Sequence, residues 1–276
     1  MIPLSLLLVL HFLRNANKDA ARELKKKLKT AGKGQLVAVE ENLVDAVWGK
    51  DRPPRPENSV FILSDTYTGI LCHMQYLAVG KPFQEKITEL RKELREKKVS
   101  GMVVSMLDEV AWLFNLRGSD IDYNPVFFAY ALITQDSATL CIDEKKLPQE
   151  VKEHLEGVKI APYEDIFGHI KTLGEGIDPE VQDSKIFVSN RCSWALTLSL
   201  GENKVTEGRS PVQDAKAVKN DVEQEGMRQC HIRDGTALVE YFAWLENELK
   251  EGKKLDEVDG ADKLEEFRRY AISCLD

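Results

Sequence analysis

The segment Gly101–Gln135 constrains the fold of this chain more than any other, because two apolar runs enclose an amphipathic segment and a polar turn. The apolar runs predict strands at Met102–Val104 and Val126–Ile133. Between them, the sequence predicts a short helix at Leu107–Leu113 and a turn at Arg117–Asn124. A strand–helix–turn–strand unit of this kind predicts a sheet with helices packed against it.

Downstream of this unit, strand and helix patterns alternate along the chain. Strands are predicted at Thr139–Ile142, Val158–Ile160 and Lys185–Val188, and helices at Pro148–Leu155, Tyr163–Leu173 and Cys192–Leu198. No internal repeat or low-complexity segment interrupts the alternation. The pattern predicts an α/β domain with a sheet covered by helices.

The sequence before Gly101 is less regular. Helices are expected at Asn17–Ala31 and Phe83–Lys97 from their charge distribution and apolar spacing. The proline-rich segment Gly49–Asn58 excludes helix and predicts an exposed boundary loop. The apolar block Ile70–Val79 follows neither a helical nor a strand period, so no element is predicted there. Short elements are predicted at Leu36–Val39, Asn42–Trp48 and Phe61–Thr68.

Two helices are predicted near the end of the chain. The longer one is Asp221–Leu249, and Asn220 with Glu223 forms a capping-box pattern at its start. Asp234 falls within its apolar stripe and is interpreted as a hydrogen-bonded polar contact rather than a catalytic residue. A last helix is predicted at Ala261–Arg269. The stripe consists of Met227, Cys230, Leu238, Phe242, Leu245 and Leu249.

The composition excludes some classes of partner and compartment. The net charge of −8 and the isoelectric point near 5.4 argue against nucleic acid, which needs a concentrated basic surface. The five cysteines are dispersed and odd in number, which favours a reducing, cytoplasmic compartment over a disulfide framework. Met1–Leu13 is apolar but lacks a basic start and a cleavage site, so a buried element or an aberrant start is favoured, and a targeting segment stays open. No other stretch is a candidate for crossing a membrane.

The residues themselves predict no active site. The five histidines show no metal-ligand spacing, and the chain has no glycine-rich phosphate loop or nucleophile elbow. The dispersed cysteines provide no nucleophile with a nearby base. No catalytic, cofactor-binding or metal-ligating residue is therefore assigned from the sequence pattern.

Several longer sequence motifs, or words, occur in an order that is specific to one enzyme family. They are Leu107–Asp120 (LDEVAWLFNLRGSD), Asn124–Ala131 (NPVFFAYA), Lys216–Asn220 (KAVKN) and Glu265–Arg269 (EEFRR). These words resemble the cytosolic Xaa-Pro aminopeptidases, also called aminopeptidase P. Glu41–Pro56 resembles the end of that family's first N-terminal domain, so the resemblance covers most of residues 17–269.

The resemblance implies two creatinase-like α/β domains, with a mixed sheet and flanking helices, followed by a pita-bread catalytic domain. Residues 1–81 would form a partial first N-terminal domain, residues 82–212 the second creatinase-like domain, and residues 213–276 the first helices of the pita-bread domain. The family removes the N-terminal residue from peptides whose second residue is proline, using a dinuclear site that typically holds manganese. It also implies a cytoplasmic homodimer.

No catalytic or metal-binding residue carries over from the family to this chain. The family's Asp, Asp, His, Glu and Glu ligands lie downstream of the word matched by Glu265–Arg269, so none has a counterpart here. The segment Asp234-Gly235-Thr236 resembles a metal-binding word only superficially, because the second aspartate is missing and the segment lies in the long helix. The chain is therefore expected to be an inactive N-terminal fragment that binds no cofactor.

Three segments depart from the family pattern, namely Met1–Asn15, Ile70–Val79 and Tyr270–Asp276. A shortened or imperfectly joined sequence would explain all three, with Tyr270–Asp276 replacing the rest of the catalytic domain. The alternative function is a non-catalytic interaction module that forms a homodimer or associates with a full-length copy.

Two polar residues in the most specific word are expected to have structural roles. Asp120 is expected to fix the turn by accepting backbone N–H groups, and Arg117 is expected to reach a neighbouring domain. A substrate-facing role for these residues in an intact dimer stays open at this stage.

Overall fold

The structure of the chain is a computed structural model that describes residues 9–10, 18–32, 36–38, 43–63 and 80–273. The chain divides into two compact units, residues 1–62 with 83–217 and residues 63–82 with 218–276. Each unit is described by itself. In the part of the chain that the structure describes, no helix is long and apolar enough to cross a membrane.

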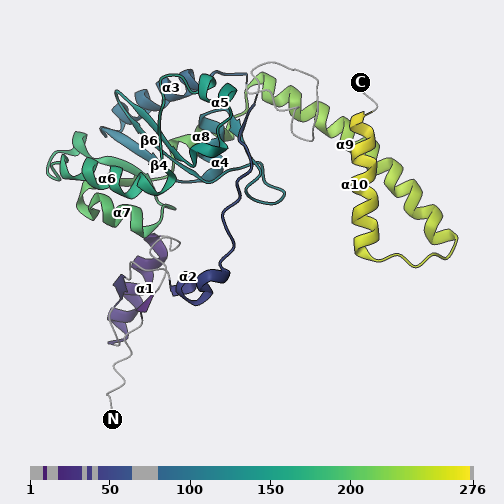
Figure 1. The fold of residues 1–276 in the computed structure, drawn as a ribbon, viewed down its shortest axis with the longest axis horizontal. Coiled ribbons are helices and arrows are strands. Elements are labelled where there is room, and N and C mark those ends of the chain that lie inside the picture. Colours follow the sequence, from purple (N-terminus) through teal and green to yellow (C-terminus); the bar gives the residue numbers. More distant parts are fainter. Residues whose placement is uncertain (1–8, 11–17, 33–35, 39–42, 64–79, 274–276) are drawn as a thin grey trace, which may run out of the picture. The chain divides into compact units, whose positions relative to one another are not determined.

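The first unit is built on a six-stranded mixed sheet in the order β10-β9-β4-β6-β7-β8 (Figure 1). The strands are β4 (Gly101–Val104), β6 (Ala129–Thr134), β7 (Ala138–Ile142), β8 (Lys159–Ala161), β9 (Ile186–Ser189) and β10 (Val205–Gly208). Strands β4, β9 and β10 run parallel, β6 is antiparallel to both of its neighbours, and β7 pairs with β8 in parallel. This arrangement confirms the predicted mixed α/β fold.

Helices cover both faces of the sheet because successive side chains of the strands point to opposite faces. Met102 and Val104 of β4 belong to one buried cluster, whereas Val103 between them belongs to the other. The first cluster is closed by α3 (Phe83–Glu96), α4 (Leu107–Leu113), α5 (Gln149–His154) and α8 (Pro211–Ala217). The second is closed by α6 (Ile166–Glu175) and α7 (Trp194–Leu200).

Shorter elements join the same unit before α3. They are β1 (Val9–Leu10), α1 (Lys18–Thr30), β2 (Val37–Ala38), α2 (Leu43–Trp48), a 3₁₀ turn at Gly49–Asp51 and β3 (Phe61–Ile62). Strand β3 pairs antiparallel with β5 (Leu116–Arg117), and Val60 N–H donates to the Lys146 carbonyl at 2.8 Å. These contacts attach the end of the proline-rich segment to the unit that carries the sheet.

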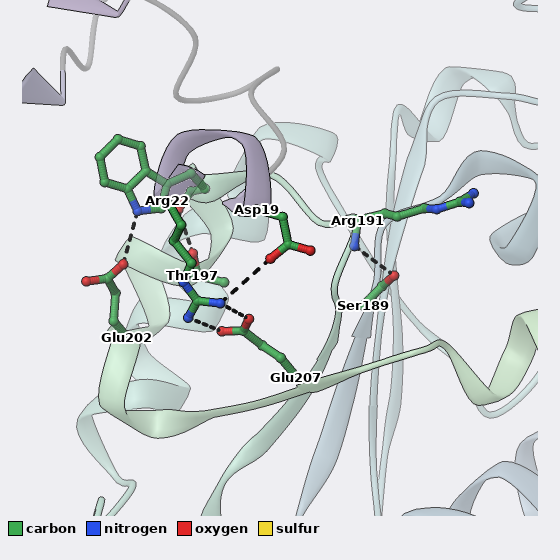
Figure 2. A network of polar contacts seen from close by, with 8 residues as sticks. Asp19, Arg22, Ser189, Arg191, Thr197, Glu202 and Glu207 are labelled. Atoms are coloured by element: carbon green, nitrogen blue, oxygen red, sulfur yellow. Dashed lines mark hydrogen bonds and ion pairs between the residues drawn. The ribbon is translucent and has the colours of Figure 1, made fainter. Parts of the chain in front are cut away.

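Helix α1 is attached to the edge strand β10 by an ion pair. Both Nη atoms of Arg22 donate to the carboxylate of Glu207, at 2.7 and 3.0 Å, and Asp19 lies 3.8 Å from the same guanidinium (Figure 2). The bidentate geometry fixes the guanidinium in the plane of the carboxylate. Because both partners reach solvent, the pair contributes orientation more than stability.

The second unit contains the helices α9 (Asp221–Lys250) and α10 (Glu257–Ser273), which pack against each other. The predicted capping box is confirmed, since Asn220 Oδ1 accepts from Glu223 N–H at 2.9 Å and Glu223 Oε2 accepts from Asn220 N–H at 3.0 Å. Asp234 on α9 pairs with Arg268 on α10 at 2.6 Å, which confirms its interpretation as a polar contact. Gly252, with φ of +75°, begins the connection between the helices.

The structure corrects several predicted boundaries. The strand predicted from Val126 begins at Ala129, because Val126 and Phe128 bond Asp120 in the turn, and Leu116–Arg117 forms a short strand where a turn was predicted. Strand β10 and helix α8 were missed. Helix α10 runs from Glu257 to Ser273, so the last helix is longer at both ends than the predicted Ala261–Arg269.

The outcome for the apolar stripe of α9 is mixed. Leu238 and Leu245 are half-buried in the helix pair, whereas Met227, Phe242 and Leu249 are exposed. Within the described residues of α9, only Gly226 and Ala237 are buried. The expectations for Met1–Asn15 apart from Val9–Leu10, for Ile70–Val79 and for most of Phe61–Thr68 lie outside the described residues.

Two glycines of α6 provide a matched test of the packing between α6 and α7. A Cβ added to Gly174 would overlap with the carbonyl oxygen of Leu200, whereas a Cβ on Gly168 would meet nothing within 4 Å. We expect Gly168→Ala to stabilise the chain by about 0.5–1 kcal/mol through helix propensity. Gly174→Ala should instead destabilise it by about 1–3 kcal/mol through overpacking. Urea unfolding of the two variants measures both changes, and equal effects would contradict the packing.

Candidate functional site

The turn that follows β5 is held by Asp120, whose side chain is fully buried. Its Oδ2 accepts from Phe128 N–H at 2.7 Å and forms an ion pair with Lys146 Nζ. Its backbone N–H donates to the Val126 carbonyl at 3.1 Å. The predicted turn-fixing role of Asp120 is therefore confirmed, and the ion pair with Lys146 is an addition that the sequence did not indicate.

Arg117 stabilises the start of the same turn. Its Nη1 donates to the carbonyls of Ala111 and Leu116, at 3.1 and 2.8 Å, and so ties the end of α4 to β5. A contact with a neighbouring domain and a substrate-facing role stay predictions.

A cavity of about 420 Å³ lies beside this turn. It lies between the proline-rich segment and the loops that follow β7 and β8, and its lining includes Arg52, Arg55, Phe128, Lys146 and Tyr163. A second cavity of about 440 Å³ shares Arg55, Asp143, Tyr163 and Glu164 with the first. Both volumes fall in the range of small-ligand sites, roughly 300–1,000 Å³.

Arg55 lines both cavities and links the proline-rich segment to the loop after β8. Its guanidinium lies 4.5 Å from the centre of the Tyr163 ring and pairs with the Glu164 carboxylate. Burial works against the charged guanidinium, but the hydrogen bond and charge of Glu164 outweigh it and raise the pKa of Arg55. Burial raises the pKa of Tyr163 well above its usual range, and the neighbouring Tyr130 adds to the shift. The pair is thus a permanent cation on a neutral ring.

A second polar cluster lies at the carboxyl ends of the parallel strands β4 and β10, where ligands commonly bind in α/β folds. Ser210 Oγ donates to Glu109 Oε2 at 2.6 Å, and Lys216 pairs with Asp108. Burial raises the pKa of Glu109, while the hydroxyl of Ser210 lowers it. These bonds join α4 to α8, so we assign the cluster a packing role.

Cys141 and His154 lie in structural environments, and the described residues contain no metal centre. Burial raises the pKa of the Cys141 thiol to about 11, so this group stays protonated and unreactive at neutral pH. The ring of His154 bonds the Phe114 carbonyl at 2.9 Å and packs on Phe83, which is a structural role. Across the described ranges, no group of three or more His, Cys, Asp or Glu side chains could hold a metal ion.

With this geometry established, a comparison with protein-family models decides the family. Residues 51–223, more than half of the chain, match the Creatinase/Prolidase N-terminal domain. The chain belongs to this family. The match contains the central sheet and both cavities, so the features above are parts of a creatinase/prolidase N-terminal domain.

Relatives of this creatinase/prolidase chain carry the name Probable Xaa-Pro aminopeptidase P. One from Pyrenophora teres f. teres is 57% identical over 256 residues, which cover 90% of this chain and 37% of that protein. One from Aspergillus niger is 56% identical over 253 residues, which cover 90% of this chain and 39% of that protein. The chain thus spans about two fifths of the length of these relatives. The resemblance to the Xaa-Pro aminopeptidases is confirmed.

Solved structures agree with this family. The X-prolyl aminopeptidase from Caenorhabditis elegans, described as a cytosolic enzyme with a di-nuclear active site, is 34% identical with a TM-score of 0.83. That match covers 95% of this chain and 41% of the enzyme. An Xaa-Pro dipeptidase from Bacillus anthracis, 15% identical with a TM-score of 0.50 over 68% of this chain and 49% of that one, shares the fold. The described residues of this chain do not fit a di-nuclear metal site, because they contain no suitable ligand group.

Sequence reasoning missed Lys146, Arg55 and Tyr163 because their partners are remote in the chain. Arg55 and Glu164 are separated by 109 positions, and Lys146 lies 26 positions after Asp120. The only indication in the sequence was that Lys146 and Arg55 are basic residues in segments that otherwise favour turns. Basic residues are so common in turns that this pattern does not indicate a site.

The buried Asp120–Lys146 pair gives a stability prediction. Lys146→Met or Asp120→Asn leaves one buried group without its partner, so each should lower the free energy of unfolding by about 3–5 kcal/mol. The double variant should lose less than the sum of the two single losses, because it leaves neither charge behind. Lys145→Met, at an exposed neighbouring position, is the control and should change stability by less than about 0.5 kcal/mol. Single losses no larger than that of the control would contradict the pairing.

Proposed function

We propose that this chain is the N-terminal part of a metal-dependent Xaa-Pro aminopeptidase, which removes the N-terminal residue from peptides whose second residue is proline. The observation that carries the proposal is the 57% identity to a Probable Xaa-Pro aminopeptidase P over 90% of the chain. Identity at this level over 256 residues is hard to reconcile with a different activity of the whole protein. The fold shared with the C. elegans enzyme supports the same conclusion.

In this proposal the chain contributes structure rather than chemistry. Residues 1–81 form part of a first N-terminal domain, residues 82–212 a second one, and residues 213–276 the first helices of the catalytic domain. The metal, proposed to be manganese in the cytoplasm, is held by residues outside this sequence.

The first experiment tests catalysis directly. The purified 276-residue chain, incubated with Mn²⁺ and a peptide carrying proline at its second position, is expected to release no N-terminal residue, because a two-metal hydrolysis needs its ligands. The C. elegans enzyme under the same conditions is the positive control, and a peptide with alanine at the second position controls for substrate class. Metal-dependent release by the chain alone would overturn the assignment of the ligands to other residues.

A second candidate function is self-association, and the outer face of α9 favours it. Ile232, Val239, Phe242 and Leu249 are all more than half exposed and recur at heptad spacing along the helix. Ala237 and Asp234, by contrast, lie on the side that faces α10. An apolar seam with heptad spacing is typical of a helix that pairs with a copy of itself. We therefore propose a second copy of this chain, or of the longer protein, as the partner.

Light scattering after size exclusion tests this association. We expect the chain to form a dimer within a concentration range that extends to about 100 μM. The double variant Val239→Glu with Phe242→Glu should remain monomeric, because two charges would enter the seam. Asn247→Glu adds a charge at another exposed position of α9 and should leave the dimer intact. A wild-type chain that stays monomeric throughout this range would exclude the proposed partner.

A further inference from the structure

Among the described residues around the cavity beside Arg55, the basic side chains have ion-pair partners, whereas two of the carboxylates do not. Three cations line it, and each has a carboxylate of its own: Arg52 pairs with Asp45 at 3.0 Å, Arg55 with Glu164, and Lys146 with Asp120. An anionic ligand would therefore have to compete with a carboxylate already in place at each cation. The cavity is for this reason a poor anion site, although its lining is rich in basic residues.

Two further carboxylates in the lining, Glu57 and Asp143, are not matched in this way. Within the described residues, neither forms an ion pair with a basic side chain. Asp143 Oδ1 accepts from Lys145 N–H at 3.1 Å, which leaves Oδ2 and the charge uncompensated. Both residues are exposed, so a ligand can reach them from solvent. The unpaired charge of the lining is negative.

The rest of the lining is apolar and flat. Phe128 and Tyr163 provide aromatic rings, and Pro53, Pro54 and Pro56 of the proline-rich segment provide rigid apolar surface. Proline-rich backbone keeps its shape without internal hydrogen bonds, so this side of the cavity is formed before any ligand arrives. A ligand that fits has a positive charge and a flat or apolar body.

We propose that this cavity binds an arginine side chain of a peptide, with the guanidinium facing Glu57 and Asp143. The volume of about 420 Å³ accommodates a side chain of this size together with part of its backbone. A planar guanidinium stacks on aromatic rings and binds carboxylates with two parallel hydrogen bonds, which a lysine ammonium does not do. A metal ion does not fit, because the two carboxylates are not part of a group of three or more ligands.

The chain itself shows how this surface recognises arginine. Arg55 already lies on the Tyr163 ring and pairs with Glu164, and the residue that follows it is Pro56. The bound arginine would repeat this arrangement in the same cavity, against Phe128, Glu57 and Asp143 of its lining. This inference goes beyond the proposed aminopeptidase function and does not depend on it.

Titration calorimetry of the whole 276-residue chain with three small probes tests the ligand class. N-acetyl-arginine amide is expected to bind, and N-acetyl-citrulline amide, which has the same shape without the charge, should bind at least about tenfold more weakly. N-acetyl-lysine amide should also bind more weakly than the arginine compound, because it cannot stack or form the double hydrogen bond. Equal binding of the arginine and citrulline probes, equal binding of the arginine and lysine probes, or no binding of arginine would overturn the proposal.

Two charge-removing variants test the site. Glu57→Gln and Asp143→Asn should each weaken binding of the arginine probe by about tenfold. Asn at position 143 retains an Oδ1 that accepts from Lys145 N–H, so the local turn is kept while the charge is lost. Glu156→Gln, an exposed carboxylate that does not line the cavity, is the matched control and should bind as the wild type does.

Thermal unfolding of the variants separates binding from folding, since all three should melt with the wild type. Unchanged binding in both cavity variants, or an equal loss in Glu156→Gln, would show that the arginine probe binds elsewhere. Because these measurements involve no peptide cleavage, they can fail while the aminopeptidase proposal stands, and the converse also holds.

Discussion

The layers of the first unit depend on the burial of strand β4 on both of its faces. All four residues of β4 are buried, and the strand pairs with β6 on one side and β9 on the other. A central strand whose side chains leave water in both directions needs helices above and below it. Met102 and Val104 are covered by one helical layer and Val103 by the other, so the sheet has two separate cores.

Because both faces of the sheet are buried, the polar side chains of the candidate site lie in the loops at the ends of the strands. Lys146 and Asp143 follow β7, and Tyr163 follows β8. In this arrangement the buried ion pair of Asp120 and Lys146 links the turn after β5 to the loop after β7. Val60, just after the proline-rich segment, bonds the loop after β7, and Arg55 within the segment pairs with Glu164 in the loop after β8. Arg55 and residues of both loops line the cavities. The site therefore results from where the sheet ends, rather than from any motif in the sequence.

Much of the fold could be predicted because its elements are encoded locally. The helix at Leu107–Leu113 has the predicted bounds, and the capping box of Asn220 and Glu223 has the predicted bonds. Strand β10 was missed because its residues, Val205–Gly208, contain only one strongly apolar side chain and are half-buried at the sheet edge. Packing against β9 decides its conformation, and a single sequence does not show that neighbour.

By itself, the sequence determined the family, the mixed α/β class and the expectation that catalysis lies with residues outside this chain. Those conclusions depend on words such as Leu107–Asp120 and on periodicities within single elements, and both are properties of neighbouring residues. Only the tertiary structure decided that Asp120 pairs with Lys146 and that Arg55 stacks on Tyr163. These residues lie far apart in the chain and meet only when the helices pack on both faces of the sheet. That packing involves the whole unit rather than any single element.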